Sequence, residues 1–448
     1  MRTATLVIVI AMLAGAGRAA EAPAAGDPAA ILRAFFAEND AAKRADLAKQ
    51  FGAVAPKAWA EVKALLHQAA PFPAMAPGKQ PFQTKGDADV PSVNYVLRIP
   101  AGYKADAGRA WPLIIGCHGT GGTGDAAMTW LEGLLGADAD QYVLACPAAP
   151  TEREYTASRA NTEYPVRVLQ DVRHRVNLDS NRSVLTGVSR GGYAVWGTIL
   201  FSPGEWAGAA PIASWPLTEA RAAGVTLYLP NVLALPIQAH WGENDLSPGQ
   251  KQGINTFSRD VNRWFIVHGP KNFEGIEYPG QAHGLTLDAE KLRAFFAAAR
   301  RDPYPAVVNY LFHHLWQGRA YFVRATAMAR DEFDFTAPHM VKADTQDELA
   351  KAEGELYRKE AAEITALTQG AENTVSVNTR NLAGIEVEVG PEELDFSKPV
   401  KVLVNGRLAG GEVKALDWGL VLETARQSYD FERLVGARVK ATIPASKR

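Results

Sequence analysis

The run Gly187-Val188-Ser189-Arg190-Gly191 places a hydroxyl nucleophile between two glycines. A β-type run, 182–186, precedes it, and a segment that can form a helix, 192–196, follows it. On a tight strand-to-helix turn, the residues two before and two after the serine must be small. The serine hydroxyl then projects above the sheet at the N-terminal end of the helix. The pattern predicts that Ser189 is a catalytic nucleophile.

A serine hydroxyl is a poor nucleophile until a base and an orienting acid activate it. Asp245 follows an apolar run that ends at His240, and His283 lies in a polar, glycine-containing loop after another apolar run. We therefore predict Asp245 as the acid and His283 as the base. Glu243 is the competing acid, and a solvated loop carboxylate without a catalytic role is the alternative for either acid.

The reaction also needs donors for the negative charge that develops on the substrate oxygen. The segment His118-Gly119-Thr120-Gly121-Gly122 follows the apolar run 113–117, and its glycines allow backbone N–H groups to approach a substrate. The amides of Gly119, Thr120 and Arg190 are the predicted oxyanion hole. A glycine-rich turn with a structural His118 is the alternative. A phosphate loop is disfavoured because no Lys-Ser or Lys-Thr pair follows.

Three aromatic residues lie beside these segments in sequence, and each can line a substrate pocket or belong to the core: Tyr193, Trp215 and Trp241. The pair His313–His314 suggests a metal site, but it lacks a nearby third ligand and helical spacing. We expect neither a metal nor another cofactor.

The elements that must position these residues follow from hydrophobic periodicity. Apolar strand-like runs alternate with helical segments between residues 94 and 301, which argues for a mainly parallel sheet covered on both faces. The expected strands are 94–97, 113–117, 143–146, 183–186, 237–240 and 275–278. The expected helices lie near 126–135, 166–175, 192–200 and 255–263.

The flanking regions differ in pattern. Residues 21–70 have helical spacing, 71–91 are rich in Pro, Gly and Lys and are expected to form a connecting loop, and residues after 303 contain short alternating runs with an Asn405–Gly406 hairpin signal. A charged segment, 344–368, is expected to be helical. We predict a signal peptide (1–20), a helical extension and linker (21–90), an α/β catalytic domain (91–302) and a β-rich domain with a helical insertion (303–448).

The N-terminus has the features of an export signal. Arg2 precedes an uncharged, mostly apolar run, 4–16, and small residues favour cleavage after Ala19 or Ala20. A retained anchor helix is the alternative. Cleavage predicts a periplasmic or secreted protein without a stable membrane anchor. The formal net charge of −2 becomes −4 when Arg2 and Arg18 leave with this segment, which gives no support for nucleic-acid binding.

The chain has two cysteines, Cys117 and Cys146, near the ends of two apolar runs. In an oxidising compartment they can pair. Two buried thiols on neighbouring strands are the alternative, since side-by-side strand positions fit disulfide geometry poorly.

Residues 91–302 resemble the α/β-hydrolase superfamily. They are most similar to secreted esterases of the feruloyl esterase and polyhydroxybutyrate depolymerase type, and to dienelactone-hydrolase-like and prolyl-oligopeptidase-like domains. The motifs that carry the resemblance are 112–115 leading into His118–Gly119, 184–193, 242–245 and 281–284. The resemblance implies the roles given above for Ser189, Asp245 and His283. Arg190 stands where those esterases often have Met.

Three functions are compatible with these observations. The first is a hydrolase of small or polymer-attached carboxylic esters that works through an acyl-enzyme. The second is a serine peptidase of the prolyl-oligopeptidase type. The third is a non-catalytic binding protein on a hydrolase scaffold, in which the β-rich region does the binding. Neither the substrate nor the oligomeric state follows from the sequence.

Overall fold

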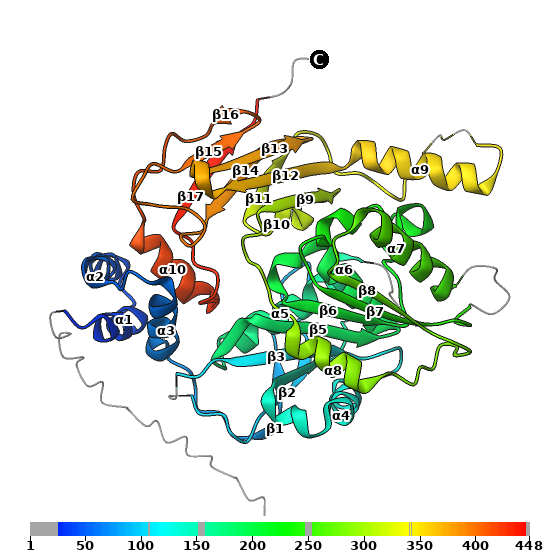
Figure 1. Cartoon of the computed structure of the whole chain (residues 1–448), viewed down its shortest axis with the longest axis horizontal. Coiled ribbons are helices and arrows are strands. Elements are labelled where there is room, and N and C mark those ends of the chain that lie inside the picture. Colours follow the sequence, from blue (N-terminus) through cyan, green and yellow to red (C-terminus); the bar gives the residue numbers. More distant parts are fainter. Residues whose placement is uncertain are drawn as a thin grey trace, which may run out of the picture.

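The computed structural model describes residues 26–105, 108–150, 157–246, 253–339, 341 and 343–444. The predicted signal peptide lies outside these residues. Figure 1 shows an N-terminal group of helices at the left, a large twisted sheet with helices around it, and a β-rich part above them.

The large sheet has the strand order β1-β2-β4-β3-β5-β6-β7-β8. Its strands are β1 (Gly78–Gln83), β2 (Asn94–Ile99), β3 (Trp111–Cys117), β4 (Val143–Pro147), β5 (Leu178–Val188), β6 (Gly208–Ile212), β7 (Ile237–Gly242) and β8 (Phe273–Tyr278). β2 pairs antiparallel with β1 and β4, and the pairs from β4 to β8 are parallel. This is the strand order of an α/β-hydrolase sheet, which confirms the predicted fold class.

Helices cover both faces of this sheet. The helices are α4 (Gly124–Leu135), α5 (Arg159–Arg173), α6 (Arg190–Phe201), α7 (Ile254–His268) and α8 (Ala289–Ala298). Apolar side chains of α5, α6 and α7 share one buried cluster with β3 and β5, whereas those of α4 and α8 belong to a second cluster. Consecutive residues of β3 alternate between the two apolar clusters: Ile114 belongs to the second cluster, and Leu113 and Ile115 belong to the first.

The structure corrects several element predictions. The expected loop 71–91 contains β1, which extends the sheet, and β6 and α8 were not predicted. The expected helix 344–368 ends at Glu360, and its last part is strand β12. β1 and β12 were missed because a strand at or near a sheet edge needs only one apolar face, so it lacks a continuous apolar run. The domain boundaries remain predictions.

The β-rich part is a sandwich of two sheets around one buried apolar cluster. One sheet has the order β10-β11-β14-β17 and the other β16-β15-β13-β12-β9. Its elements are β9 (Val307–Phe312), β10 (Arg319–Ala320), β11 (Val323–Met328), α9 (Gln346–Glu360), β12 (Ala362–Gln369), β13 (Thr374–Arg380), β14 (Leu382–Val389), β15 (Lys401–Val404), β16 (Arg407–Leu408), α10 (Trp418–Ser428) and β17 (Ala437–Thr442).

Helix α10 was not predicted. It lies near the C-terminal end of the sequence but packs beside the N-terminal helices (Figure 1). Its buried residues pack against the N-terminal helices α1 (Pro28–Ala37), α2 (Ala41–Val54) and α3 (Trp59–Ala69) in one apolar cluster. The Trp418 ring lies 5.1 Å from Phe51 and 5.5 Å from Trp59 between centroids. The remaining short helices are of the 3-10 type: η1 (Gly136–Gln141), η2 (Pro203–Glu205), η3 (Arg221–Gly224), η4 (Leu229–Val232), η5 (Leu315–Gln317) and η6 (Gly370–Glu372).

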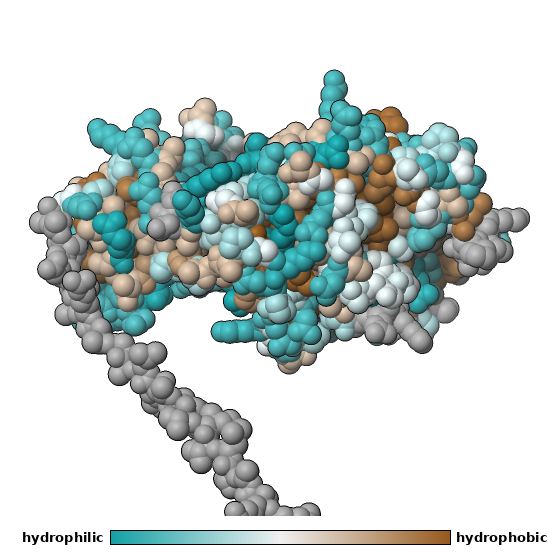
Figure 2. Space-filling model, turned by 90° about the horizontal axis from the view of Figure 1, so that it is seen from below, coloured by the Kyte–Doolittle hydropathy of each residue, from teal (hydrophilic) through white to brown (hydrophobic). Residues whose placement is uncertain are grey.

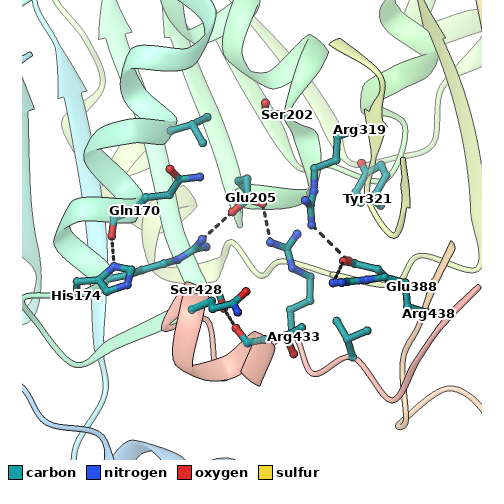
Figure 3. A pocket seen from close by; sticks show the side chains of 16 residues that line it. Gln170, His174, Ser202, Glu205, Arg319, Tyr321, Glu388, Ser428, Arg433 and Arg438 are labelled. Carbon is teal, nitrogen blue, oxygen red and sulfur yellow. Dashed lines mark hydrogen bonds and ion pairs between the residues drawn. The ribbon is translucent and has the colours of Figure 1, made fainter. Parts of the chain in front are cut away.

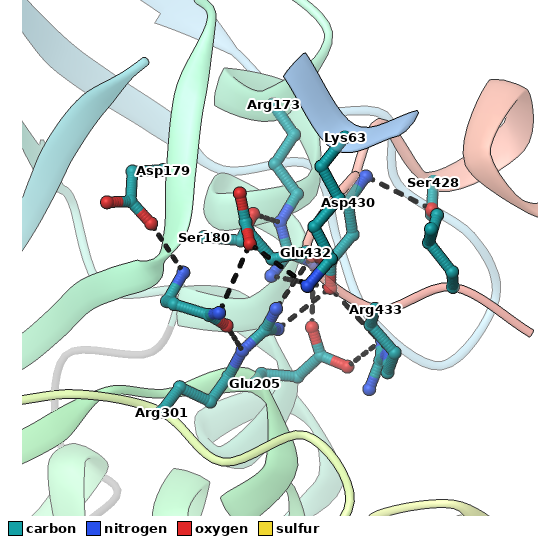
Figure 4. Close-up of polar contacts among 12 residues, drawn as sticks. Lys63, Arg173, Asp179, Ser180, Glu205, Arg301, Ser428, Asp430, Glu432 and Arg433 are labelled. Carbon is teal, nitrogen blue, oxygen red and sulfur yellow. Dashed lines mark hydrogen bonds and ion pairs between the residues drawn. The ribbon is translucent and has the colours of Figure 1, made fainter. Parts of the chain in front are cut away.

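A buried ion network joins the large sheet to the segment after α10 (Figure 4). The Asp430 carboxylate is fully buried and accepts two hydrogen bonds from Arg301, at 2.8 and 2.7 Å. Arg173 and Arg433 lie 3.4 and 3.6 Å from the same carboxylate. Glu205 links the same two arginines at 2.7 Å each. Burial alone would raise the pKa of Asp430, but the arginines reverse this and hold it well below its ordinary value.

We expect Asp430→Asn to lower the free energy of unfolding by about 3–5 kcal/mol, because it leaves buried guanidinium groups without their counter-charge. Urea denaturation of the full chain measures the change. Asp46→Asn is the matched control, since Asp46 and Lys49 form an exposed pair with 69% and 80% of their side chains accessible. Equal costs for the two substitutions would contradict a stabilising role for this network.

Cys117 and Cys146 are free thiols and both are buried. Burial raises the pKa of Cys117 to about 12 and raises that of Cys146 as well. The structure therefore agrees with the alternative of two unpaired thiols on the neighbouring strands β3 and β4.

The face seen in Figure 2 shows hydrophobic residues in separate patches between hydrophilic ones. No described helix is both long and apolar enough to cross a membrane. Scattered surface apolar residues are ordinary on folded domains.

Candidate active site

Ser189 lies on the sharp turn between β5 and α6. Its backbone has φ 56° and ψ −119°, a strained conformation for a residue with a side chain. A Cβ on Gly187 would lie 2.6 Å from the Gly191 carbonyl oxygen, and one on Gly191 would lie 2.2 Å from that of Cys117. The glycines on either side are thus required by close backbone packing, as the sequence pattern predicts.

The structure brings Ser189, His283 and Asp245 together. Ser189 Oγ lies 2.9 Å from His283 Nε2, and His283 Nδ1 lies 3.0 and 3.1 Å from the two carboxylate oxygens of Asp245. With Nδ1–H donating to Asp245, Nε2 is left to accept the Ser189 proton. The His283 side chain is 52% exposed, whereas that of Asp245 is 6% exposed. This is the geometry of a nucleophile, a base and an orienting acid.

The parallel sheet explains why three distant residues meet. Ser189 directly follows β5, Asp245 follows β7 by three residues, and His283 follows β8 by five residues. Strands β5, β6, β7 and β8 are neighbours and parallel, so their carboxyl ends share one edge. Ligand sites of open α/β sheets occupy this edge.

The two candidate acids have different contacts. Glu243 Oε2 accepts a hydrogen bond from the Gly280 backbone at 2.7 Å, in the loop that carries His283. Asp245, not Glu243, contacts the imidazole. The Glu243 side chain therefore supports the position of the histidine loop.

Sequence reasoning missed Asn255, the second residue of α7. Its backbone N–H donates to the Asp245 carbonyl at 3.2 Å, and its side-chain amide donates to the Glu243 carbonyl at 2.6 Å. Asn255 thereby ties the acid-bearing turn to the helix that follows it. A single Asn near a helix start carries no signal in the sequence that identifies this contact.

The predicted oxyanion loop lies beside the nucleophile. A Cβ placed on Gly119 would be 3.6 Å from the Ser189 Cβ. The His118 Nε2 accepts a hydrogen bond from the Ala149 backbone at 3.1 Å, so Nδ1 carries the proton and donates to the Gly119 carbonyl at 2.7 Å. In the planar trans peptide, the Gly119 carbonyl and the Thr120 N–H point in opposite directions. A hydrogen bond that fixes the carbonyl therefore also fixes the direction of the Thr120 N–H. His118 thus orients the loop, as its structural alternative expects, and the oxyanion role of Gly119, Thr120 and Arg190 stays a prediction.

Arg190 begins α6, so its backbone N–H lies at the start of the helix beside Ser189. Its side chain is 4% exposed. Burial raises the pKa of the Cys117 thiol and the Tyr164 hydroxyl, while the charge of Arg190 opposes both shifts.

The three predicted pocket aromatics differ in their surroundings. Tyr193 lies one turn of α6 beyond Ser189 and contacts the Trp215 ring, with centroids 6.3 Å apart. Trp215 stacks on Phe257 at 4.2 Å. Trp241 is 2% exposed and belongs to the main apolar cluster, which is the core alternative that the sequence left open.

The two side chains of the His313–His314 pair have separate hydrogen-bond partners. His313 accepts from the Tyr228 hydroxyl and donates to the Tyr357 carbonyl, whereas His314 lies between Glu219 and Glu332. Among the side chains that the structure describes, no group of three or more His, Cys, Asp or Glu is placed to hold a metal ion.

The hydrogen bond from His283 to Asp245 raises the pKa of His283 above its ordinary value of 6.5, although partial burial opposes the shift. Because a histidine can act as a base only in its neutral form, the predicted role of His283 implies that kcat/KM for an ester falls as pH drops through this raised pKa. The midpoint of the profile therefore lies above about 6.5. Asp245→Asn is expected to move the residual profile to lower pH. A wild-type midpoint below about 6 would contradict this prediction.

No protein-family model matches the chain, and no curated protein matches it. Among solved structures, a thermostable esterase is similar to 48% of this chain at 19% identity, with a TM-score of 0.36. A putative dipeptidyl aminopeptidase IV from Bacteroides ovatus covers 50% at 15% identity, TM-score 0.39. The chain spans 60% and 36% of these two proteins. An acetyl xylan esterase from Aspergillus awamori covers 49% of this chain, and 99% of its own, at 13% identity and a TM-score of 0.38. All three TM-scores are below 0.5, so the strand order and site geometry of this chain, and not these likenesses, support the function proposed below.

Proposed function

We propose that this protein is a serine hydrolase that cleaves carboxylic esters through an acyl-enzyme intermediate. The single observation that supports this most strongly is the hydrogen-bonded series Ser189, His283 and Asp245, with the serine on a strained turn. A non-catalytic scaffold would have no need to maintain a strained serine, a correctly oriented imidazole and a buried acid together.

In the proposed reaction, His283 Nε2 takes the proton of Ser189 as Oγ attacks the ester carbonyl carbon. Asp245 holds the Nδ1–H tautomer and stabilises the imidazolium that forms. The backbone amides of Gly119 or Thr120 and of Arg190 donate to the developing oxyanion. The imidazolium then protonates the leaving alcohol. Water, deprotonated by His283, attacks the acyl-enzyme and restores Ser189.

The preference for esters over amides rests on the leaving group. An alcohol needs less protonation to leave than an amine does, so a triad with a half-exposed base serves esters well. Peptide cleavage requires in addition a pocket that anchors the peptide. Tyr193 and Trp215 offer an aromatic surface close in sequence to the nucleophile and its neighbouring strand, which suits an acyl or aromatic group.

The test is a matched pair of substrates with one acyl group, a p-nitrophenyl ester and the corresponding p-nitroanilide. We expect kcat/KM for the ester to exceed that for the amide by at least about a hundredfold, a barrier difference of roughly 2.7 kcal/mol. The Ser189→Ala protein provides the background rate for both. Comparable rates on an aminoacyl or dipeptidyl amide and its ester would favour a peptidase instead.

A further inference from the structure

A hollow lies where α5 and η2, the β-sandwich and α10 meet, and we name it the junction pocket (Figure 3). It has a volume of about 420 Å³ and is lined from α5, η2, β10, β14, α10 and β17. This volume is within the range of small-molecule sites.

The junction pocket is separate from the candidate active site. Ser189 precedes the first residue of α6, whereas Ser202, which lines the junction pocket, follows the last. A helix of 12 residues is about 18 Å long. Substrate bound at Ser189 therefore does not fill this hollow.

The lining is rich in guanidinium groups. Arg173, Arg319, Arg433 and Arg438 line the hollow together with two carboxylates, Glu205 and Glu388, among the described lining residues. In Figure 3 the labelled Arg319, Arg433 and Arg438 lie around the hollow with both carboxylates. Two carboxylates outside the lining also pair with these arginines: Asp430 with Arg173 and Arg433, and Glu386 with Arg438 at 3.4 Å. The hollow therefore offers guanidinium N–H donors, not a net positive charge.

Both lining carboxylates are already paired with arginines of the hollow. Glu205 already bridges two of the arginines, at 2.7 Å each. Burial alone would raise its pKa, but the guanidiniums of Arg433 and Arg173 reverse the effect and hold the pKa well below its ordinary value, so it is already ionised. Glu388 lies 3.3 Å from Arg319 and 3.0 Å from Arg438.

Three buried donors of the lining are also unsatisfied. Among the described lining residues, Arg173 Nη2, Arg319 Nε and the Tyr321 hydroxyl are buried and have no hydrogen-bond partner. A guanidinium donates through a planar fork that matches a carboxylate or a phosphate. The side-chain amides of Gln170 and Gln427 line the same hollow and can bind hydroxyl groups.

From these features we propose that the junction pocket binds a small oxyanion ligand, up to the size of a sugar acid, through Arg319 and Arg438. The bound group is a carboxylate or a phosphate, which share the geometry that a guanidinium recognises. Because α5 and η2, the sandwich and α10 all line the pocket, such a ligand would stabilise their contact by binding the folded state alone.

The test is calorimetric titration of the full chain at constant ionic strength with three probes: sodium D-glucuronate, inorganic phosphate and neutral D-glucose. We expect saturable binding of at least one anion and none of glucose. Tighter binding of glucuronate than of phosphate indicates a sugar acid, and the reverse indicates a phosphate group. Either result supports the proposal.

Arg319→Gln and Arg438→Gln are expected to weaken anion binding by at least about tenfold. Their side chains are 42% and 34% exposed, so each removes a charge at the rim of the network and spares its buried centre. Arg324→Gln is the matched control, because Arg324 is on the neighbouring strand, is 54% exposed and does not line the pocket. We expect its affinity to stay within about twofold of wild type.

Absence of saturable anion binding would overturn the proposal. So would binding that both rim variants retain, or an equal loss in Arg324→Gln, which would indicate general surface electrostatics. Labelling of Ser189 by a fluorophosphonate is expected to be normal in all three variants. The outcome at the junction pocket is therefore independent of the proposed esterase activity.

Discussion

Ser189→Ala is expected to abolish covalent labelling by a fluorophosphonate probe and to reduce ester turnover by roughly 10⁴-fold or more. The reason is that Ser189 Oγ is the group within hydrogen-bond distance of His283 Nε2, at 2.9 Å, and alanine has no atom that can form the acyl-enzyme. Labelling is read by intact-protein mass spectrometry, and turnover with a p-nitrophenyl ester.

The control for this experiment is Ser376→Ala. Ser376 lies on β13 of the sandwich, where its hydroxyl donates to Gln369, and it is not part of the candidate active site. Labelling and turnover are expected to stay at wild-type levels. Probe incorporation that persists in Ser189→Ala would place the reactive nucleophile elsewhere and remove the basis of the proposed mechanism.

Asp245→Asn is expected to reduce kcat by about 10³–10⁴-fold while the fold is retained. Asparagine has nearly the same shape, but an amide neither compensates the imidazolium charge nor reliably accepts from Nδ1–H. The imidazole is then no longer held in the tautomer that leaves Nε2 free to accept the serine proton. Steady-state kinetics and circular dichroism separate loss of catalysis from loss of structure.

Glu243→Gln is the matched control, because it makes the same change from acid to amide two residues away. The glutamine carbonyl can still accept from the Gly280 backbone, which Glu243 does at 2.7 Å. We expect a change in kcat of less than about fivefold, the size of one modest hydrogen-bond effect. A larger loss in Glu243→Gln than in Asp245→Asn would assign the acid role to Glu243.

The sequence predicted the sheet and the residues that the structure brings together at its edge. Continuous apolar strands such as β3 and β4 are buried on both faces, so their composition alone indicates them. The turn at Ser189 also has a signal in the nearby sequence, since Gly187 must be small to pass the Gly191 backbone. The contact of Gly191 with Cys117 of β3 appears only in the folded chain. Asp245 was predicted as the acid with Glu243 as its competitor, because the sequence does not show which carboxylate faces His283.

The sequence by itself determined which residues can serve as nucleophile, base and acid, because turn chemistry and strand periodicity are local properties. Only the tertiary structure decided the role of α10, the edge strand β1 and the junction pocket. Asp430 bonds Arg301 across 129 residues, and Arg433 bonds Glu205 across 228. A charged residue in such a pair resembles any surface residue in the sequence, because its burial depends on partners that only the folded chain brings close.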